Sequence, residues 1–159
     1  MRTEEEATRA VETYADLVRR ICALHVKNRQ DTEDIFQTVF LKYLLYSGTF
    51  QSAEHEKAWF VRVTVNACRD VLRSLFRRNT VPLETAEELS AGNSENREVL
   101  QAVLSLPVKY KDAIYLHYYE GYAATEIADI MHKPVNTVYT MLARARKLLK
   151  EKLGGDEVE

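Results

Sequence analysis

Apolar side chains recur at helical spacing, three or four residues apart, along most of this chain of 159 residues. This pattern predicts helices over residues 5–27, 31–46, 57–76, 97–120, 121–131 and 135–153. Asp31, with Asp34 three residues later, indicates the start of the second helix, and Pro107 starts or interrupts the fourth. No segment shows the apolar–polar alternation of a half-buried strand. The predicted fold class is therefore all-α.

Two stretches lose the helical pattern and separate the predicted helices. Residues 47–57 contain a glycine and several small polar residues, which predicts a loop. Residues 77–96 contain proline, glycine, asparagine and serine, which are typical of a linker. The predicted organisation is two helical domains of unequal size, 1–78 and 97–159, joined by a flexible linker at 79–96.

The formal net charge is only −2, but the charges are unevenly distributed. Residues 59–78 carry five arginines against one aspartate, a net of 5 − 1 = +4, and residues 131–153 carry six cations against one glutamate, a net of 6 − 1 = +5. Residues 79–96 carry four glutamates and no lysine or arginine, a net of −4. The small net charge therefore does not exclude a nucleic-acid partner, because two basic patches flank an acidic stretch.

Several classes of protein are excluded by features that the sequence lacks. No apolar run approaches the ~20 residues that span a bilayer, and the acidic N-terminus has no apolar core, so we expect a cytoplasmic protein without membrane insertion. Cys22 and Cys68 lie in helical patterns without metal-ligand spacing and are predicted as reduced, buried thiols. No two histidines stand at ligand spacing, and no glycine-rich phosphate loop is present. We expect no enzymatic activity, no metal and no cofactor.

The most specific motif lies between Gly121 and Leu153. GYAATEIADIM predicts a short helix, HKP ends it, and Pro134 suits the first turn of the longer basic helix that follows. A short helix, a tight turn and a second helix with a narrow apolar seam form the helix-turn-helix pattern, which inserts the second helix into the DNA major groove. The residues predicted to point away from the seam are Asn136, Tyr139, Thr140, Ala143, Arg144, Lys147 and Lys150. A basic face that is merely solvated, or that binds a membrane or an acidic groove, is the alternative.

Three segments stand in order along the chain: DTEDIFQTVFLKYL, KAWFVRVTVNACRDVLRS and LSLPVKYKDAIYLHYYEGYAATEIADIMHKPVNTVYTMLARARKLLKEKL. They resemble, in turn, region 2.2, regions 2.3 to 2.4 and region 4 of the extracytoplasmic-function (ECF) group of bacterial RNA polymerase sigma factors. The resemblance covers residues 8–153 with the order and spacing of that family. It implies promoter recognition and transcription initiation. The alternative is a stand-alone helix-turn-helix regulator that binds operator DNA as a dimer.

The resemblance implies that region 2.2 docks on a coiled coil of the polymerase β′ subunit. The residues implied are Asp34, Gln37, Phe40 and Leu41. Asp34 and Gln37 lie three residues apart on one helix face, and a carboxylate and an amide beside apolar anchors suit a basic helical partner. Two alternatives stay open: Phe40 and Leu41 belong to the core, and Asp34 caps the helix or forms a local ion pair.

The resemblance assigns the −10 promoter element to the segment that follows. The residues implied are Phe50, Gln51, Ser52, Trp59, Arg62, Asn66, Arg69 and Arg73. A base that leaves the stack needs a pocket and a stacking surface, and the predicted loop Gly48–Glu56 is the candidate pocket. The polar residues from 62 to 73 form a stripe in which arginine suits the DNA backbone and asparagine a base edge. For Trp59, a place in the core is the commoner role, and stacking is the alternative.

The resemblance assigns the −35 element to the second helix of the helix-turn-helix motif. The residues implied are Asn136, Thr137, Tyr139, Thr140, Met141, Arg144, Arg146, Lys147 and Lys150. The segment departs from the family pattern in three respects: Ala123 replaces a capping Ser or Thr, His132 replaces the turn glycine, and Tyr139 and Met141 replace two cationic base readers. We therefore expect residues 139–141 to touch base edges and the four cations that follow them to contact phosphates.

The predicted partners are promoter DNA and the RNA polymerase core, through its β′ coiled coil and β flap, with an anti-sigma factor as a further candidate. A sigma factor is expected to be a monomer that gains specificity only with core polymerase, whereas a repressor dimer binds a palindromic operator alone. Residues 59–73 favour the sigma factor, because a repressor needs no strand-opening helix in its other domain.

Overall fold

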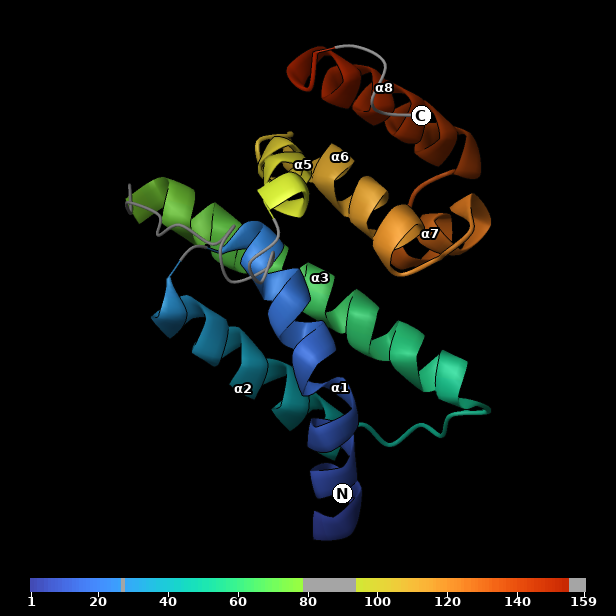
Figure 1. Cartoon of the computed structure of the whole chain (residues 1–159). Coiled ribbons are helices and arrows are strands. Elements are labelled where there is room, and N and C mark those ends of the chain that lie inside the picture. Colours follow the sequence, from blue (N-terminus) through green and yellow to red (C-terminus); the bar gives the residue numbers. More distant parts are fainter. Residues whose placement is uncertain (27, 79–93, 155–159) are drawn as a thin grey trace. The chain divides into compact units, whose positions relative to one another are not determined.

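The computed structural model describes residues 1–26, 28–78 and 94–154, and it divides into two compact units, Met1–Thr85 and Ala86–Glu159 (Figure 1). The described residues form helices joined by turns, without a strand, which confirms the all-α prediction. The division between the units falls within the predicted linker, of which residues 79–93 lie outside the described residues.

The first unit is built from α1 (Glu4–His25), α2 (Arg29–Leu45) and α3 (Ala53–Arg78), and each of these helices packs against the other two (Figure 1). Thr3 caps α1 in a reciprocal arrangement, because its Oγ accepts from the Glu6 N–H at 3.1 Å while the Glu6 carboxylate accepts from the Thr3 N–H at 3.1 Å. The core contains the fully buried side chains Val18, Ile21, Leu24, Ile35, Val39, Tyr43, Phe60, Val61 and Val65.

The predicted start of α2 at Asp31 is wrong. The helix begins at Arg29, and Asn28 is its cap, with extended backbone angles and a side-chain oxygen that accepts from the Asp31 N–H at 2.8 Å. Asp31 therefore occupies the third helical position, where its N–H needs a partner. Both residue types suit a cap, and Asn28 is the one that takes this place.

The predicted loop over residues 47–57 is too long, because α3 begins at Ala53. Ser52 caps this helix: its Oγ accepts from the His55 N–H at 3.1 Å, and its carbonyl accepts from the Glu56 N–H at 3.1 Å. The apolar pattern is lost in the first turn because Glu56, which is only 7% exposed, fills a position that faces the core. The α2–α3 loop is residues 46–52, and it contains residues 48–52 of the predicted pocket segment, whereas residues 53–56 belong to α3.

The second unit contains α5 (Ser94–Leu104), α6 (Val108–Ile114), η1 (Tyr115–Tyr119), α7 (Ala124–Met131) and α8 (Val135–Lys152). α5 begins before the predicted domain boundary at residue 97, and Pro107 starts α6 as expected. η1 is a wide π-helical turn that closes with a bond from the Glu120 N–H to the Tyr115 carbonyl at 3.2 Å. α8 packs on α5, α6 and α7, and its apolar side completes the core of this unit.

Cys22 and Cys68 are thiols that are not joined in a disulfide, and both are completely buried, which confirms their predicted place in the core. Within the described ranges, no helix combines the length and apolar character needed to cross a bilayer. The same part of the chain holds no cluster of three or more side chains with metal-binding chemistry.

Candidate nucleic-acid interface

The turn between α7 and α8 has the geometry of a helix-turn-helix motif. His132 ends α7 in the left-handed conformation, with φ 55°, and the Lys133 N–H donates to the Ala128 carbonyl at 2.9 Å. His132 therefore occupies the left-handed position where the family usually has glycine, and histidine is among the residue types that tolerate this conformation. At the other end of α7, Ala123 has no side-chain acceptor: its N–H donates to Glu126 Oε1 at 2.8 Å, and its carbonyl accepts from the Ile127 N–H at 3.0 Å.

The outer face of α8 carries most of the residues predicted to meet DNA. Val138, Leu142, Ala145 and Leu149 are buried, as the apolar seam predicts. The side chains on the exposed side are Asn136, Thr137, Tyr139, Thr140, Ala143, Arg144, Lys147 and Lys150. Tyr139 is 55% exposed although it is large and apolar, so the described residues leave much of this ring uncovered.

The prediction that Met141 touches a base edge is wrong. Met141 is only 4% exposed, because it lies three residues after Val138 and four before Ala145, on the buried side of the helix. The base-reading candidates on this part of α8 are therefore reduced to Tyr139 and Thr140. The Thr140 hydroxyl donates to the Asn136 carbonyl at 3.1 Å, and the residue as a whole is exposed.

Arg146 differs from the other cations of α8 because it is half-buried and bound within the unit. Its Nη1 donates to the hydroxyl of Tyr118 at 3.2 Å, and Tyr118 belongs to η1 and is 50% exposed. Sequence reasoning missed this pair, because 28 residues separate its members. The tyrosine holds the guanidinium beside η1, at the edge of the outer face.

The polar stripe of α3 is present as the spacing predicts. Asn66 and Arg73 are exposed, and Arg62 and Arg69 are half-buried. Arg73 pairs with Asp70 at 2.8 Å, and both of these side chains are about 70% exposed. Such a surface pair is worth only ~0–1 kcal/mol, so Arg73 can exchange its carboxylate partner for a phosphate at little cost.

The place in the core, which is the commoner role for Trp59, is confirmed, and the alternative role as a stacking platform for a base is wrong. Trp59 is 6% exposed, and its ring lies 5.1 to 6.0 Å from four other aromatic rings. These four rings are Tyr43, Tyr46, Phe50 and Phe60. Of the other predicted loop residues, Phe50 is half-buried in this cluster, while Gln51 and Ser52 are exposed. Ser52 also has its capping role at α3.

Sequence reasoning missed Glu56, whose carboxylate joins all three helices of the first unit. It accepts from Arg9 Nη2 at 3.0 Å, from the Tyr14 hydroxyl at 2.9 Å and from the Tyr43 hydroxyl at 3.0 Å. Burial by itself raises the pKa of Glu56, but these hydrogen bonds together outweigh it, so the pKa lies below its usual value. The available signal was its position one turn before Trp59 and Phe60, where a charged residue at a core position needs partners.

The exposed face of α2 contains three of the four residues predicted to bind polymerase. Asp34, Gln37 and Leu41 are exposed, and Leu41 is 56% exposed. Phe40 instead packs in the core against Phe36 and Phe60, so the core alternative is confirmed for Phe40. Asp34 does not cap the helix and accepts only a local bond from Gln30 Nε2 at 3.0 Å among its described contacts. Sequence reasoning missed Leu45, which is exposed one turn after Leu41.

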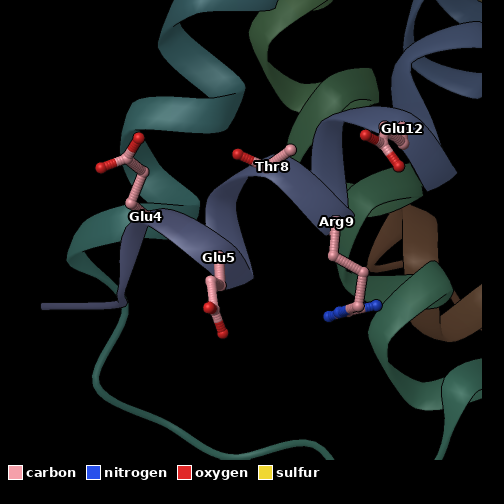
Figure 2. A pocket seen from close by; sticks show the side chains of 5 residues that line it. All are labelled: Glu4, Glu5, Thr8, Arg9 and Glu12. Atoms are coloured by element: carbon pink, nitrogen blue, oxygen red, sulfur yellow. The ribbon is translucent and has the colours of Figure 1, made fainter.

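A shallow groove lies on the first three turns of α1, away from these faces. Its lining residues are Glu4, Glu5, Thr8, Arg9 and Glu12, and Figure 2 shows Glu5 and Arg9 pointing to the same side of the helix. Three carboxylates against one arginine give the groove a negative charge. This charge disfavours contact with phosphates.

Two family models match the chain. The model described as Sigma-70 region 2 matches residues 10–78, and the model described as Sigma-70, region 4 matches residues 96–149. The first match ends at the last residue of α3, and the second extends from α5 into α8. The order of the two matches is the order that the sequence motifs predict.

Relatives and solved structures agree with these matches. The RNA polymerase sigma factor SigV of Bacillus subtilis is 33% identical over 142 residues, which cover 87% of this chain and 86% of that protein. The ECF RNA polymerase sigma factor SigW of the same species is 24% identical over 165 residues, covering 90% and 86%. The sigma factor RpoE, solved in complex with the anti-sigma factor NepR from Bartonella quintana, has the same fold, with a TM-score of 0.78, 19% identity and coverage of 96% and 99%.

A helix-turn-helix unit and a three-helix unit with a basic stripe, each matched by the corresponding family model, define a DNA-binding transcription initiation factor. The chain belongs to the sigma-70 family of RNA polymerase sigma factors, in its extracytoplasmic-function group, and it directs promoter recognition and transcription initiation.

Proposed function

We propose that this sigma factor acts through three separate surfaces: the outer face of α8 for the −35 element, the α2–α3 loop with the α3 stripe for the −10 element, and the exposed face of α2 for core polymerase. The observation that carries the proposal is the burial pattern of α8. Its apolar side is fully used within the unit, whereas its outer face leaves cations and an aromatic ring exposed beside a helix-turn-helix turn.

For the −35 element, the first turns of α8 read bases and the later turns bind the backbone. Asn136, Thr137, Tyr139 and Thr140 lie on the exposed N-terminal turns, which enter the major groove in a helix-turn-helix protein. The Tyr139 ring and the Thr140 methyl group are suited to apolar contact with thymine methyls. Arg144, Lys147, Lys150 and, at the edge of the face, Arg146 supply the phosphate contacts.

For the −10 element, the α2–α3 loop receives an unstacked base while α3 tracks the strand. Phe50, Gln51 and Ser52 bring an aromatic ring and polar groups to the loop. Along α3, Arg62, Asn66, Arg69 and Arg73 extend a polar stripe from the loop, in which the cations meet phosphates and the amide meets a base edge.

For core polymerase, we assign Asp34, Gln37 and Leu41 to the β′ coiled coil and add the exposed Leu45. The acidic and amide groups suit a basic partner helix, and the two leucines supply the apolar contact that a stable interface needs. The second unit docks on the β flap. The chain itself carries no chemistry in this proposal, because the polymerase performs the reaction, and both act in the cytoplasm.

An anti-sigma partner is also part of the proposal. The RpoE structure is a complex with the anti-sigma factor NepR, and a further structure of the same fold is described as CnrH in complex with the cytosolic domain of CnrY, with a TM-score of 0.68 and 19% identity. We expect a comparable partner to compete with polymerase for the exposed face of α2.

The test is capture of core RNA polymerase by the tagged protein, followed by run-off transcription on genomic fragments with the reconstituted holoenzyme. We expect a monomer that binds core and initiates at discrete promoters, with little affinity for free DNA. A dimer that binds a palindromic operator without core, and that supports no initiation, would contradict the proposal.

A further inference from the structure

One arginine outside the predicted DNA-binding residues joins the start of α1 to the end of α2 and to the α2–α3 loop. The Arg2 guanidinium donates from Nη2 to the Gly48 carbonyl at 2.9 Å, from Nε to the Tyr43 carbonyl at 3.1 Å and from Nη1 to the Glu6 carboxylate at 3.2 Å. The Arg2 N–H donates to the Leu44 carbonyl at 3.1 Å. The side chain is only 14% exposed, so these contacts are largely shielded from water.

The same guanidinium lies over two aromatic rings, at 4.5 Å from the centre of Tyr43 and 5.2 Å from the centre of Phe50. These rings are nearly parallel, with 7° between their planes. Cation–π contacts of this kind are strongest where the cation is desolvated. Arg2 therefore holds the loop both by its backbone, at Gly48, and by its aromatic side chain, at Phe50.

The other end of the loop is held by the first turn of α3. The Gln51 N–H donates to His55 Nδ1 at 3.1 Å, and Ser52 caps the helix. Between these ends, Gly48 lies so close to the Tyr46 ring that a methyl group at this position would overlap it. With both ends fixed, the loop gives up less conformational entropy when it receives a base.

We propose that Arg2 is a positioning residue for −10 recognition, which keeps the α2–α3 loop in the conformation that receives the unstacked base. The inference rests on the proposed function of this loop. It predicts that loss of the Arg2 contacts weakens the choice between bases at the −10 element more than it weakens the fold. Lysine replaces arginine here only in part, because a single ammonium does not reach three separate acceptors and lie against two rings.

The experiment uses holoenzyme reconstituted with Arg2→Ala or Arg2→Lys and a promoter first identified by run-off transcription with the wild-type protein. Open-complex formation is measured on that promoter and on versions with single −10 substitutions, each as duplex and as premelted template. We expect Arg2→Ala to reduce the discrimination ratio about tenfold, the size of one base contact, on both templates. We expect an intermediate ratio for Arg2→Lys, and unchanged affinity for core.

The matched control is Asn28→Ala, which removes the cap of α2 at the helix end far from the loop. Folding of each variant is followed by Trp59 fluorescence. Equal loss of discrimination in Asn28→Ala and Arg2→Ala, or discrimination fully restored by premelting, would overturn the positioning role. If the wild-type holoenzyme discriminates between −10 sequences and Arg2→Ala discriminates equally well, this inference alone is overturned. If the wild-type holoenzyme itself shows no −10 preference, the proposed function of the loop is overturned.

Discussion

Replacement of Glu56 by glutamine tests how the three helices of the first unit are held together. The change keeps the size of the side chain but removes its charge and one acceptor oxygen. The carboxylate now accepts from two tyrosine hydroxyls and from Arg9, whose side chain is 54% exposed. The variant satisfies one hydroxyl fully and leaves the other without a comparable acceptor.

The magnitude follows from the burial of each partner. A buried hydroxyl that loses its acceptor costs ~1–3 kcal/mol, and the exposed Arg9 pair adds only ~0–1 kcal/mol. We therefore expect Glu56→Gln to lower the free energy of unfolding of the first unit by about 2 kcal/mol at pH 7. Urea unfolding followed by the fluorescence of Trp59, the only tryptophan of the chain, reports on this unit alone.

The effect must also depend on pH. The folded-state pKa of Glu56 lies below its value in the unfolded chain, so its stabilisation is complete above about 4.5 and is lost as the pH falls through the folded-state pKa. The difference in unfolding free energy between wild type and Glu56→Gln should therefore shrink below pH 4.5.

Glu54→Gln is the matched control, because Glu54 lies in the same helical turn and is exposed. We expect this control to change the unfolding free energy by less than ~0.5 kcal/mol. A Glu56→Gln variant that is as stable as this control at pH 7, or a difference that stays constant down to pH 3.5, would refute the role of the buried carboxylate.

Three further predictions concern the other surfaces. In a salt titration of holoenzyme binding, Lys147→Ala should weaken binding equally on all −35 sequences and lower the salt slope by ~0.9. Tyr139→Ala should instead change which −35 sequence is preferred, by ~1–3 kcal/mol. A changed sequence preference in Lys147→Ala, with the preference unchanged in Tyr139→Ala, would contradict these separate roles along α8. Asp34→Ala combined with Gln37→Ala should weaken core binding while leaving the melting temperature nearly unchanged, and unaltered affinity for core would exclude this surface. His132→Gly should stabilise the second unit by ~1 kcal/mol in thermal unfolding followed by circular dichroism, since only glycine adopts φ 55° without strain, and a lower melting temperature would show that the imidazole makes a compensating contact.

The periodicity of apolar residues predicted much of the architecture, because a helix needs only local hydrogen bonds and one apolar face to be recognised in a sequence. The seam of α8, the break at Pro107 and the buried thiols are as predicted. The outward direction of Tyr139 and Lys147 is also a matter of helical spacing alone. The motifs likewise identified the family, since their order along the chain is a property of the sequence.

Only the tertiary structure shows whether a side chain that could contact DNA is instead buried in a core. Met141 and Trp59 have side chains suited to bases, but both lie on the buried side of their helices and belong to cores. Helical spacing from Val138 and Ala145 already favours the buried side for Met141, and the packing of α8 on its neighbours encloses it there. Arg146 is similar, because its contact with Tyr118 joins residues that are distant in sequence.

Glu56 and Arg2 show the physical reason most clearly. A sequence pattern treats charged residues as exposed, because an unpaired charge in the interior is very costly. Each of these two charges is tolerated in a shielded place only because partners from other segments satisfy it: two tyrosines and an arginine for Glu56, and two carbonyls, a carboxylate and two rings for Arg2. Those partners are brought together only when α1, α2 and α3 pack. The sequence therefore determined the helices and the family, whereas the folded first unit determined where α3 begins and which contacts hold the α2–α3 loop.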